Sequence, residues 1–151
     1  NHNINNFYYK NDLIDLLNQK KDAGTPILGI CLGMQILFEK GYEVKETKGL
    51  GFLNGEIVFM DIDEKIPHMG WNSIKIKKGA RLFKDIPEDS YVYFVHSYYL
   101  KAGREEDVTA TTEYSALIHA SVEHDNVFAC QFHPEKSSEI GLKILKNFVE
   151  L

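Results

Sequence analysis

The sequence lacks long hydrophobic runs and has no excess of positive charge. None of its stretches reaches the roughly 18 consecutive apolar residues that a membrane-spanning helix requires. Its 17 Lys and Arg are outnumbered by 22 Asp and Glu, which gives a formal net charge of −5 over 151 residues. An acidic balance argues against a nucleic-acid binder, which usually carries a clustered basic face. The opening residues also lack the charged and then apolar pattern of a secretory signal.

Cysteine is scarce, since Cys31 and Cys130 are the only two. Two cysteines are too few for a disulfide framework, so a reducing, cytoplasmic location is expected. No HExxH motif and no glycine-rich phosphate loop occurs, and His2, His119 and His124 have no Cys or carboxylate at ligand spacing. We therefore expect no metal and no other cofactor. Linkers and internal repeats are missing too, which favours a single domain.

The apolar residues follow an order of helix, strand, turn and helix in the first third of the chain. Asp12–Asp22 has helical spacing, Ile27–Ile30 is typical of a buried parallel strand, and Gly33–Lys40 predicts a second helix. Later elements are expected as strands at Glu56–Met60, Ser73–Ile76, Tyr91–Val95, Asp107–Thr112 and Val127–Phe132, and as a helix at Ser138–Val149. This order predicts an α/β fold whose mixed, partly parallel sheet is flanked by helices.

The most informative run is Gly-Ile-Cys-Leu-Gly-Met-Gln at positions 29–35, where the buried strand becomes a helix. Gly-x-Cys-x-Gly at such a junction predicts a nucleophile elbow, a tight turn that presents Cys31. Glycine is expected to be needed at positions 29 and 33, because neighbouring backbone and the following helix pack very close to the turn. The start of the helix favours thiolate over thiol, and the N–H of Leu32 points where an oxyanion would form. A buried structural cysteine is the competing interpretation.

A general base is predicted downstream, in Phe-His-Pro-Glu at positions 132–135. His133 and Glu135 are two residues apart in an extended segment, so their side chains project from the same side. A carboxylate there can hold one imidazole nitrogen while the other faces a nucleophile. A surface His beside a surface Glu is the alternative for this pair alone. Together with Cys31, the pair makes a Cys-His-Glu triad candidate.

These two signatures resemble those of the class I, triad-type glutamine amidotransferases. Pro67–Asn72, Tyr93–Tyr98 and Pro134–Ser138 add motifs that resemble the glutaminase subunits of imidazole glycerol phosphate synthases within that family. The resemblance extends over essentially the whole chain, residues 1–151, and implies a flavodoxin- or Rossmann-like sheet. Family members also have an upstream strand–helix–strand unit and a Pro-Gly-x-Gly turn that supplies part of the oxyanion hole. The domain is therefore expected to be N-terminally incomplete and weak as a glutaminase by itself.

The resemblance implies a role for each matching residue. Cys31 attacks the side-chain amide of glutamine, His133 shuttles the proton and Glu135 orients it. A γ-glutamyl thioester and ammonia form, and water then releases glutamate. The residues implied to bind glutamine are Leu32, Gly33, Gln35, Glu43, His96, Ser97 and Tyr98.

The resemblance also implies a partner, a (β/α)8 cyclase that forms a heterodimer with the glutaminase in histidine biosynthesis. Free ammonia is mostly protonated near neutral pH, so a sheltered path to the cyclase is needed. The cyclase would use the ammonia to make imidazole glycerol phosphate and an aminoimidazole carboxamide nucleotide. The residues implied at the interface are Met69, Gly70, Trp71, Asn72 and Lys136.

Two alternatives stay open at this point. Similar glutaminase subunits feed ammonia to sugar-modifying amidotransferases of surface-polysaccharide pathways. The same scaffold and Cys-His-Glu arrangement also serve thiol peptidases and γ-glutamyl hydrolases, and inactive interaction subunits occur. The intact triad argues against an inactive subunit, and Gln35 with the strand 95–98 argues against a peptidase.

Overall fold

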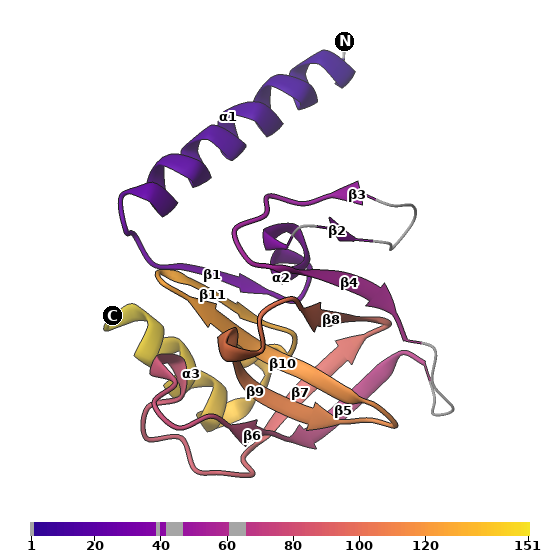
Figure 1. Cartoon of the computed structure of the whole chain (residues 1–151), viewed down its shortest axis with the longest axis vertical. Helices are drawn as coiled ribbons and strands as arrows, with labels where there is room; N and C mark the ends of the chain where they lie inside the picture. Colours follow the sequence, from indigo (N-terminus) through magenta and orange to yellow (C-terminus); the bar gives the residue numbers. More distant parts are fainter. Residues whose placement is uncertain (1, 39, 42–46, 61–65) are drawn as a thin grey trace.

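The computed structural model describes residues 2–38, 40–41, 47–60 and 66–151 of the chain (Figure 1). Its helices are α1 (His2–Asp22), α2 (Leu32–Leu37) and α3 (Ser138–Val149), with short 3-10 helices η1 (Arg81–Phe83), η2 (Glu105–Asp107) and η3 (Pro134–Lys136). The strands are β1 (Ile27–Ile30), β2 (Lys40–Gly41), β3 (Thr47–Lys48), β4 (Gly55–Phe59), β5 (His68–Ser73), β6 (Lys75–Ile76), β7 (Tyr91–His96), β8 (Tyr98–Ala102), β9 (Val108–Glu113), β10 (Leu117–His124) and β11 (Val127–Cys130).

A mixed sheet of five strands carries the site, in the order β1-β11-β10-β9-β6. Strands β1 and β11 are parallel, with Ile27 opposite Val127 and Ile30 opposite Cys130. The other pairs in this sheet are antiparallel. Because the carboxyl ends of parallel strands lie at the same edge, the residues that follow β1 and β11 meet there.

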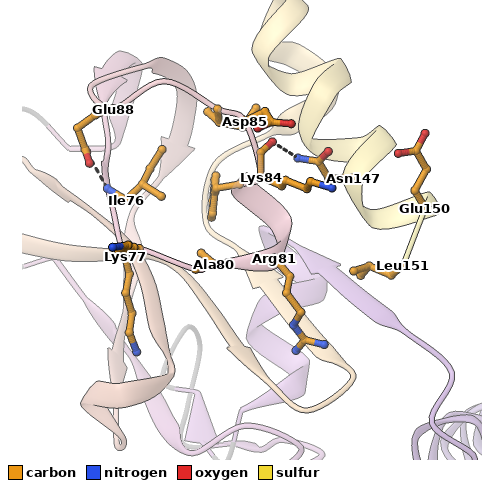
Figure 2. Close-up of a pocket in the computed structure, with 14 residues that line it drawn as sticks. Ile76, Lys77, Ala80, Arg81, Lys84, Asp85, Glu88, Asn147, Glu150 and Leu151 are labelled. Carbon is orange, nitrogen blue, oxygen red and sulfur yellow. Dashed lines mark hydrogen bonds between the residues drawn. The ribbon is translucent and has the colours of Figure 1, made fainter.

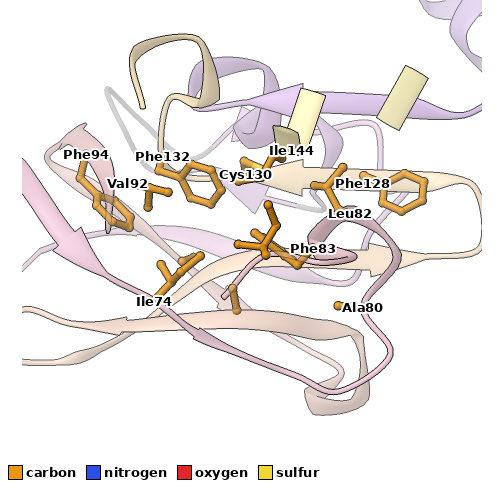
Figure 3. Close-up of a cluster of buried hydrophobic side chains, with 13 residues drawn as sticks. Ile74, Ala80, Leu82, Phe83, Val92, Phe94, Phe128, Cys130, Phe132 and Ile144 are labelled. Carbon is orange, nitrogen blue, oxygen red and sulfur yellow. The ribbon is translucent and has the colours of Figure 1, made fainter. Parts of the chain in front are cut away.

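Strand β11 is buried on both faces and separates two hydrophobic cores. Phe128 and Cys130 face a core that includes Ile144 of α3 and Phe94 of β7 (Figure 3). The alternate residues Val127 and Ala129 face the second core, which is built by α2, β4 and β8. Successive strand residues point to opposite faces, so an uninterrupted apolar strand is needed where helices cover both sides.

Two smaller sheets complete the architecture. Strands β3-β2-β4-β8 form one of them, and the hairpin β5-β7 forms the other. Helix α1 projects away from the sheets at its N-terminal end (Figure 1), while Leu17 near its C-terminal end packs against the second core. No helix in the described part of the chain combines the length and apolar character needed to cross a bilayer.

The structure confirms most expected elements and corrects some boundaries. Strand 27–30 and helix 138–149 have the predicted limits. The helix expected at 33–40 ends at Leu37, because Phe38 is extended and its carbonyl accepts a hydrogen bond from the N–H of Gly51. The expected strand 73–76 is divided between β5 and β6, since the chain leaves the hairpin at the buried Ile74.

Strand β10 was not predicted from the sequence. Its buried positions Ile118, Ala120 and Val122 alternate with exposed or polar ones. The small Ala120 and Ser121 weaken the apolar signal of this alternation, so the pattern is hard to recognise without the neighbouring strands.

Candidate active site

Cys31 occupies a strained turn between β1 and α2. Its φ is 51° and its ψ is −102°, a backbone conformation that residues with a side chain rarely adopt. Gly29 is required by close packing, because a Cβ there would lie 2.6 Å from Leu37 Cδ1 and 2.8 Å from the Gly33 carbonyl oxygen. The expected close packing at Gly33 is not found, since beyond its chain neighbours and its own helix backbone no described atom lies within 4 Å of a Cβ built there. The glutamine-binding role of Gly33 stays a prediction.

The half-buried Cys31 contacts two other segments of the chain, the end of β11 and strand β7. The backbone N–H of Cys31 donates to the Cys130 carbonyl at 2.8 Å, which ties the turn to the end of β11. The sulfur is 3.8 Å from the carbonyl oxygen of Val95 on β7. It is also 3.8 Å from Nε2 of Gln131, a residue that the sequence analysis missed.

His133 and Glu135 form a close pair just beyond β11. His133 Nδ1 lies 2.5 Å from Glu135 Oε1, so the ring donates to the carboxylate through this nitrogen. His133 Nε2 is buried and has no hydrogen-bond partner among the described residues. The backbone N–H of His133 donates to the Tyr93 carbonyl at 2.9 Å, which joins the pair to strand β7. In the neutral ring Nε2 therefore carries a lone pair ready to accept a proton.

His96 belongs to a buried hydrogen-bonded chain of side chains beneath this site. Its Nδ1 donates to the Tyr98 carbonyl at 2.7 Å, and its Nε2 lies 2.9 Å from His68 Nδ1. The His68 ring is stacked between Phe94 and Tyr114, with centroid distances of 4.8 and 3.9 Å. Burial, with smaller contributions from the nearby His68 and His133, lowers the pKa of His96 to about 4, and the hydrogen bond to the Tyr98 carbonyl opposes this shift. Both ring nitrogens of His96 are thus engaged inside the protein.

Acidification is expected to destabilise the fold through His96. The pKa of His96 is about 4 in the folded protein against an ordinary value of 6.5, so the unfolded chain binds the extra proton first. Stability is then lost as pH falls from 6.5 to 4. The two pKa values differ by about 2.5, and each pKa unit corresponds to about 1.4 kcal/mol, so the free energy of unfolding should fall by about 3–4 kcal/mol. His119, whose pKa burial also lowers, acts in the same direction.

Urea unfolding between pH 7 and pH 4 measures this loss of stability. His96→Gln should flatten the pH dependence of the free energy of unfolding. An equal pH dependence in wild type and His96→Gln would contradict the assignment.

The outer face of the β5-β7 hairpin carries large exposed apolar side chains. Met69 is 60% exposed and Trp71 48% exposed. The Trp71 ring packs edge-on against Tyr93, its partner across the hairpin, with 5.8 Å between centroids. Strand alternation places Gly70 and Asn72 on the opposite face, where Asn72 Oδ1 lies 3.2 Å from His68 Nε2. Lys136 is exposed on η3, next to Glu135.

The remaining predicted site residues differ in how the structure places them. Ser97 and Tyr98 lie at the junction of β7 and β8, where the Ser97 carbonyl accepts from the N–H of Met60 at 3.0 Å. The structure gives only the backbone of Leu32 and Gln35, on α2, and Glu43 lies outside the described residues. Their binding roles stay predictions.

The structure also has a large cleft away from these residues. It has a volume of about 710 Å³ and lies between η1 and the end of α3 (Figure 2). Arg81, Lys84 and Glu150 are among its lining residues, and none of the predicted site residues is. The candidate active site is therefore defined by its chemical groups and not by cavity size.

Comparisons with known proteins agree with this geometry. A family model described as glutamine amidotransferase class-I matches residues 6–151. The imidazole glycerol phosphate synthase subunit HisH of Lactococcus lactis is 50% identical over 93% of this chain and 70% of that protein. HisH of Methanocaldococcus jannaschii is 54% identical over 86% of this chain and 66% of its own length. The chain thus spans about two thirds of the length of these relatives.

Solved structures support the fold. A glutamine amidotransferase crystal structure aligns with a TM-score of 0.67 at 18% identity, over 91% of this chain and 66% of that one. A glutamine amidotransferase from Thermotoga maritima aligns with a TM-score of 0.63 at 18% identity, over 97% of this chain and 56% of that one. The predicted α/β fold of the glutamine amidotransferase type is confirmed. Since the family model covers nearly the whole chain and relatives share about half of its residues, the chain belongs to the class I glutamine amidotransferases, and it is similar to their HisH branch.

Proposed function

We propose that this chain is the triad-bearing part of a glutaminase subunit that supplies ammonia to an imidazole glycerol phosphate synthase in histidine biosynthesis. The observation that carries the proposal is the arrangement at the end of the parallel pair β1/β11. Cys31 follows one strand on a strained turn, and the His133–Glu135 pair follows the other. Its relatives named HisH support the choice of synthase.

The proposed reaction uses Cys31 and His133 in two half-reactions. The Cys31 thiol gives its proton to His133 Nε2, and the sulfur bonds to the side-chain amide carbon of glutamine. The C–N bond then breaks as His133 returns the proton to the departing nitrogen, which leaves as ammonia. Water attacks the thioester, His133 takes the proton of that water, and glutamate leaves as the C–S bond breaks. The Glu135 carboxylate holds His133 Nδ1 and stabilises the imidazolium.

We propose that the outer face of the β5-β7 hairpin docks the synthase partner, which in the expected complex is a (β/α)8 cyclase. Tryptophan is typical of interface hot spots and methionine is enriched at interfaces, and Trp71 and Met69 are both about half exposed. The hairpin is attached to the catalytic segment, because Tyr93 accepts from the N–H of His133 and its own N–H donates to Ser137 Oγ at 3.0 Å. Ammonia released at Cys31 would therefore leave beside the docked partner.

Ammonia release by the full-length protein tests the proposal, measured with glutamine alone and with the cyclase and its phosphoribulosyl ligand. We expect strong stimulation by the liganded cyclase and loss of activity in Cys31→Ala. Cys130→Ala serves as the matched control, because burial raises the pKa of the Cys130 thiol to about 12 and leaves it unreactive.

The other outcomes are equally informative. Basal hydrolysis of glutamine without stimulation would support the triad assignment but would indicate a sugar-modifying amidotransferase as the partner in place of the cyclase. Cleavage of peptides with no effect on glutamine would replace the glutaminase by a peptidase. No turnover of glutamine under any condition would overturn the proposed activity.

A further inference from the structure

Gln131 is a fully buried amide that the reaction described above does not use. Its side chain is 0% exposed, although it follows β11 directly. Its backbone N–H continues the sheet by donating to the Ala120 carbonyl at 2.8 Å. Its Nε2 lies 3.8 Å from the sulfur of Cys31, whereas its Oε1 is buried without a hydrogen-bond partner among the described residues.

The unpartnered oxygen indicates that this amide is retained for a reason other than stability. A buried polar atom without a partner costs about 1–3 kcal/mol, and an apolar side chain of similar size would remove that cost. The cost of unpartnered buried atoms also indicates which way the Gln131 amide points. Exchanging Oε1 and Nε2 would leave the two N–H donors of Nε2 without partners, and orphaned N–H groups are rarer in proteins than orphaned carbonyl oxygens.

The groups around the Cys31 sulfur respond differently to its ionisation. The thiol can donate to the Val95 carbonyl, but a thiolate cannot, and the carbonyl dipole then opposes the negative charge. An amide N–H donates to a thiolate more strongly than to a thiol, because hydrogen bonds to charged groups are about twice as strong. Helix α2 contributes less than a longer helix would, since its six residues make fewer than two turns.

We infer that Gln131 is a further residue of the catalytic apparatus, which donates a hydrogen bond from Nε2 to the Cys31 sulfur and stabilises its thiolate. The inference rests on the proposed role of Cys31 as nucleophile. Gln131 reaches the sulfur because β1 and β11 pair in parallel register, which brings residues 100 positions apart into contact. Burial holds the Gln131 amide in place, so its N–H already points at the sulfur and does not have to reorient when the Cys31 thiolate forms.

The rate of Cys31 alkylation by iodoacetamide, followed by mass spectrometry from pH 5 to pH 10, tests the inference in the full-length protein. Gln131→Met has a similar volume and no donor. We expect the pH midpoint of alkylation to rise by about one pH unit, which corresponds to a rate about tenfold lower below the midpoint. Tm should stay unchanged or rise by about 2–4 °C, because the orphaned oxygen is removed. The titratable groups described around the site include His133, His96, His68, Glu135 and Cys130, and this variant retains all of them.

Thr109→Val is the matched control. Thr109 Oγ1 is also buried without a partner, at 3% exposure, on β9. This variant should raise Tm in the same way and leave the alkylation midpoint unchanged. Gln131→Asn, which shortens the side chain but retains the amide, should raise the midpoint as Gln131→Met does.

An unchanged midpoint in the Gln131 variants would overturn the inference. A lowered Tm with alkylation reduced equally at every pH would also overturn it, because it would assign Gln131 a structural role. Alkylation needs no glutamine turnover, so the failure of the proposed function would be seen separately, as a wild-type protein that alkylates at Cys31 but hydrolyses no glutamine.

Discussion

His133→Asn is expected to abolish nearly all glutamine hydrolysis by the full-length protein in its synthase complex. The buried Nε2 of His133 is the proton acceptor of the proposed mechanism, and asparagine offers no basic nitrogen there. Removal of the base from a nucleophile–base pair lowers kcat by about 10⁴-fold or more. Steady-state ammonia release at saturating glutamine measures the loss, and an unchanged far-UV spectrum shows that the fold is retained.

Glu135→Gln should have a smaller effect than His133→Asn. The Glu135 side chain is 45% exposed, so water screens its charge, and we expect a loss of about 10²-fold in kcat. His124→Asn is the control for histidine replacement, since His124 pairs with Asp107 away from the triad. More than one tenth of wild-type activity in His133→Asn would rule out His133 as the base.

Gly141→Ala is expected to destabilise the protein although alanine is the better helix former. A Cβ at position 141 would lie 1.8 Å from the carbonyl oxygen of Pro134, so helix α3 would have to move away from η3. Such overpacking costs about 3 kcal/mol, or roughly 6–12 °C in Tm. Because η3 carries Glu135, glutamine hydrolysis should fall as well.

Thermal unfolding of Gly141→Ala and Leu142→Ala distinguishes the effect of close packing on stability from the effect of helix propensity. Leu142 is 66% exposed on the same helix, so its replacement should change stability by less than about 0.5 kcal/mol. A wild-type Tm in Gly141→Ala would contradict the close contact between α3 and η3.

Much of the candidate site could be predicted from short stretches of sequence. The turn at Cys31 is encoded locally, because Gly29 allows the backbone approach that a strand-to-helix turn needs. The pairing of His133 with Glu135 is local too, since residues two apart in an extended segment share a face. Helix α3 was recognisable because its apolar residues recur at helical spacing over 12 residues.

The contacts of Gln131 and His96 could not be predicted from the sequence in the same way. The contact of Gln131 with Cys31 depends on the register of two strands from opposite ends of the chain. The internal partners of His96 come from β5 and from the start of β8. No local pattern around either residue predicts these contacts.

The sequence by itself determined the α/β class, the turn at Cys31 and the His133–Glu135 pair, because each depends on backbone sterics and side-chain spacing within a few residues. Only the tertiary structure decided that β11 separates two cores, that Gly33 has room for a side chain, and that a buried amide faces the Cys31 sulfur. These features arise from strand register and from packing between distant segments. The free energy of such contacts belongs to the assembled fold and is absent from any short stretch of the chain.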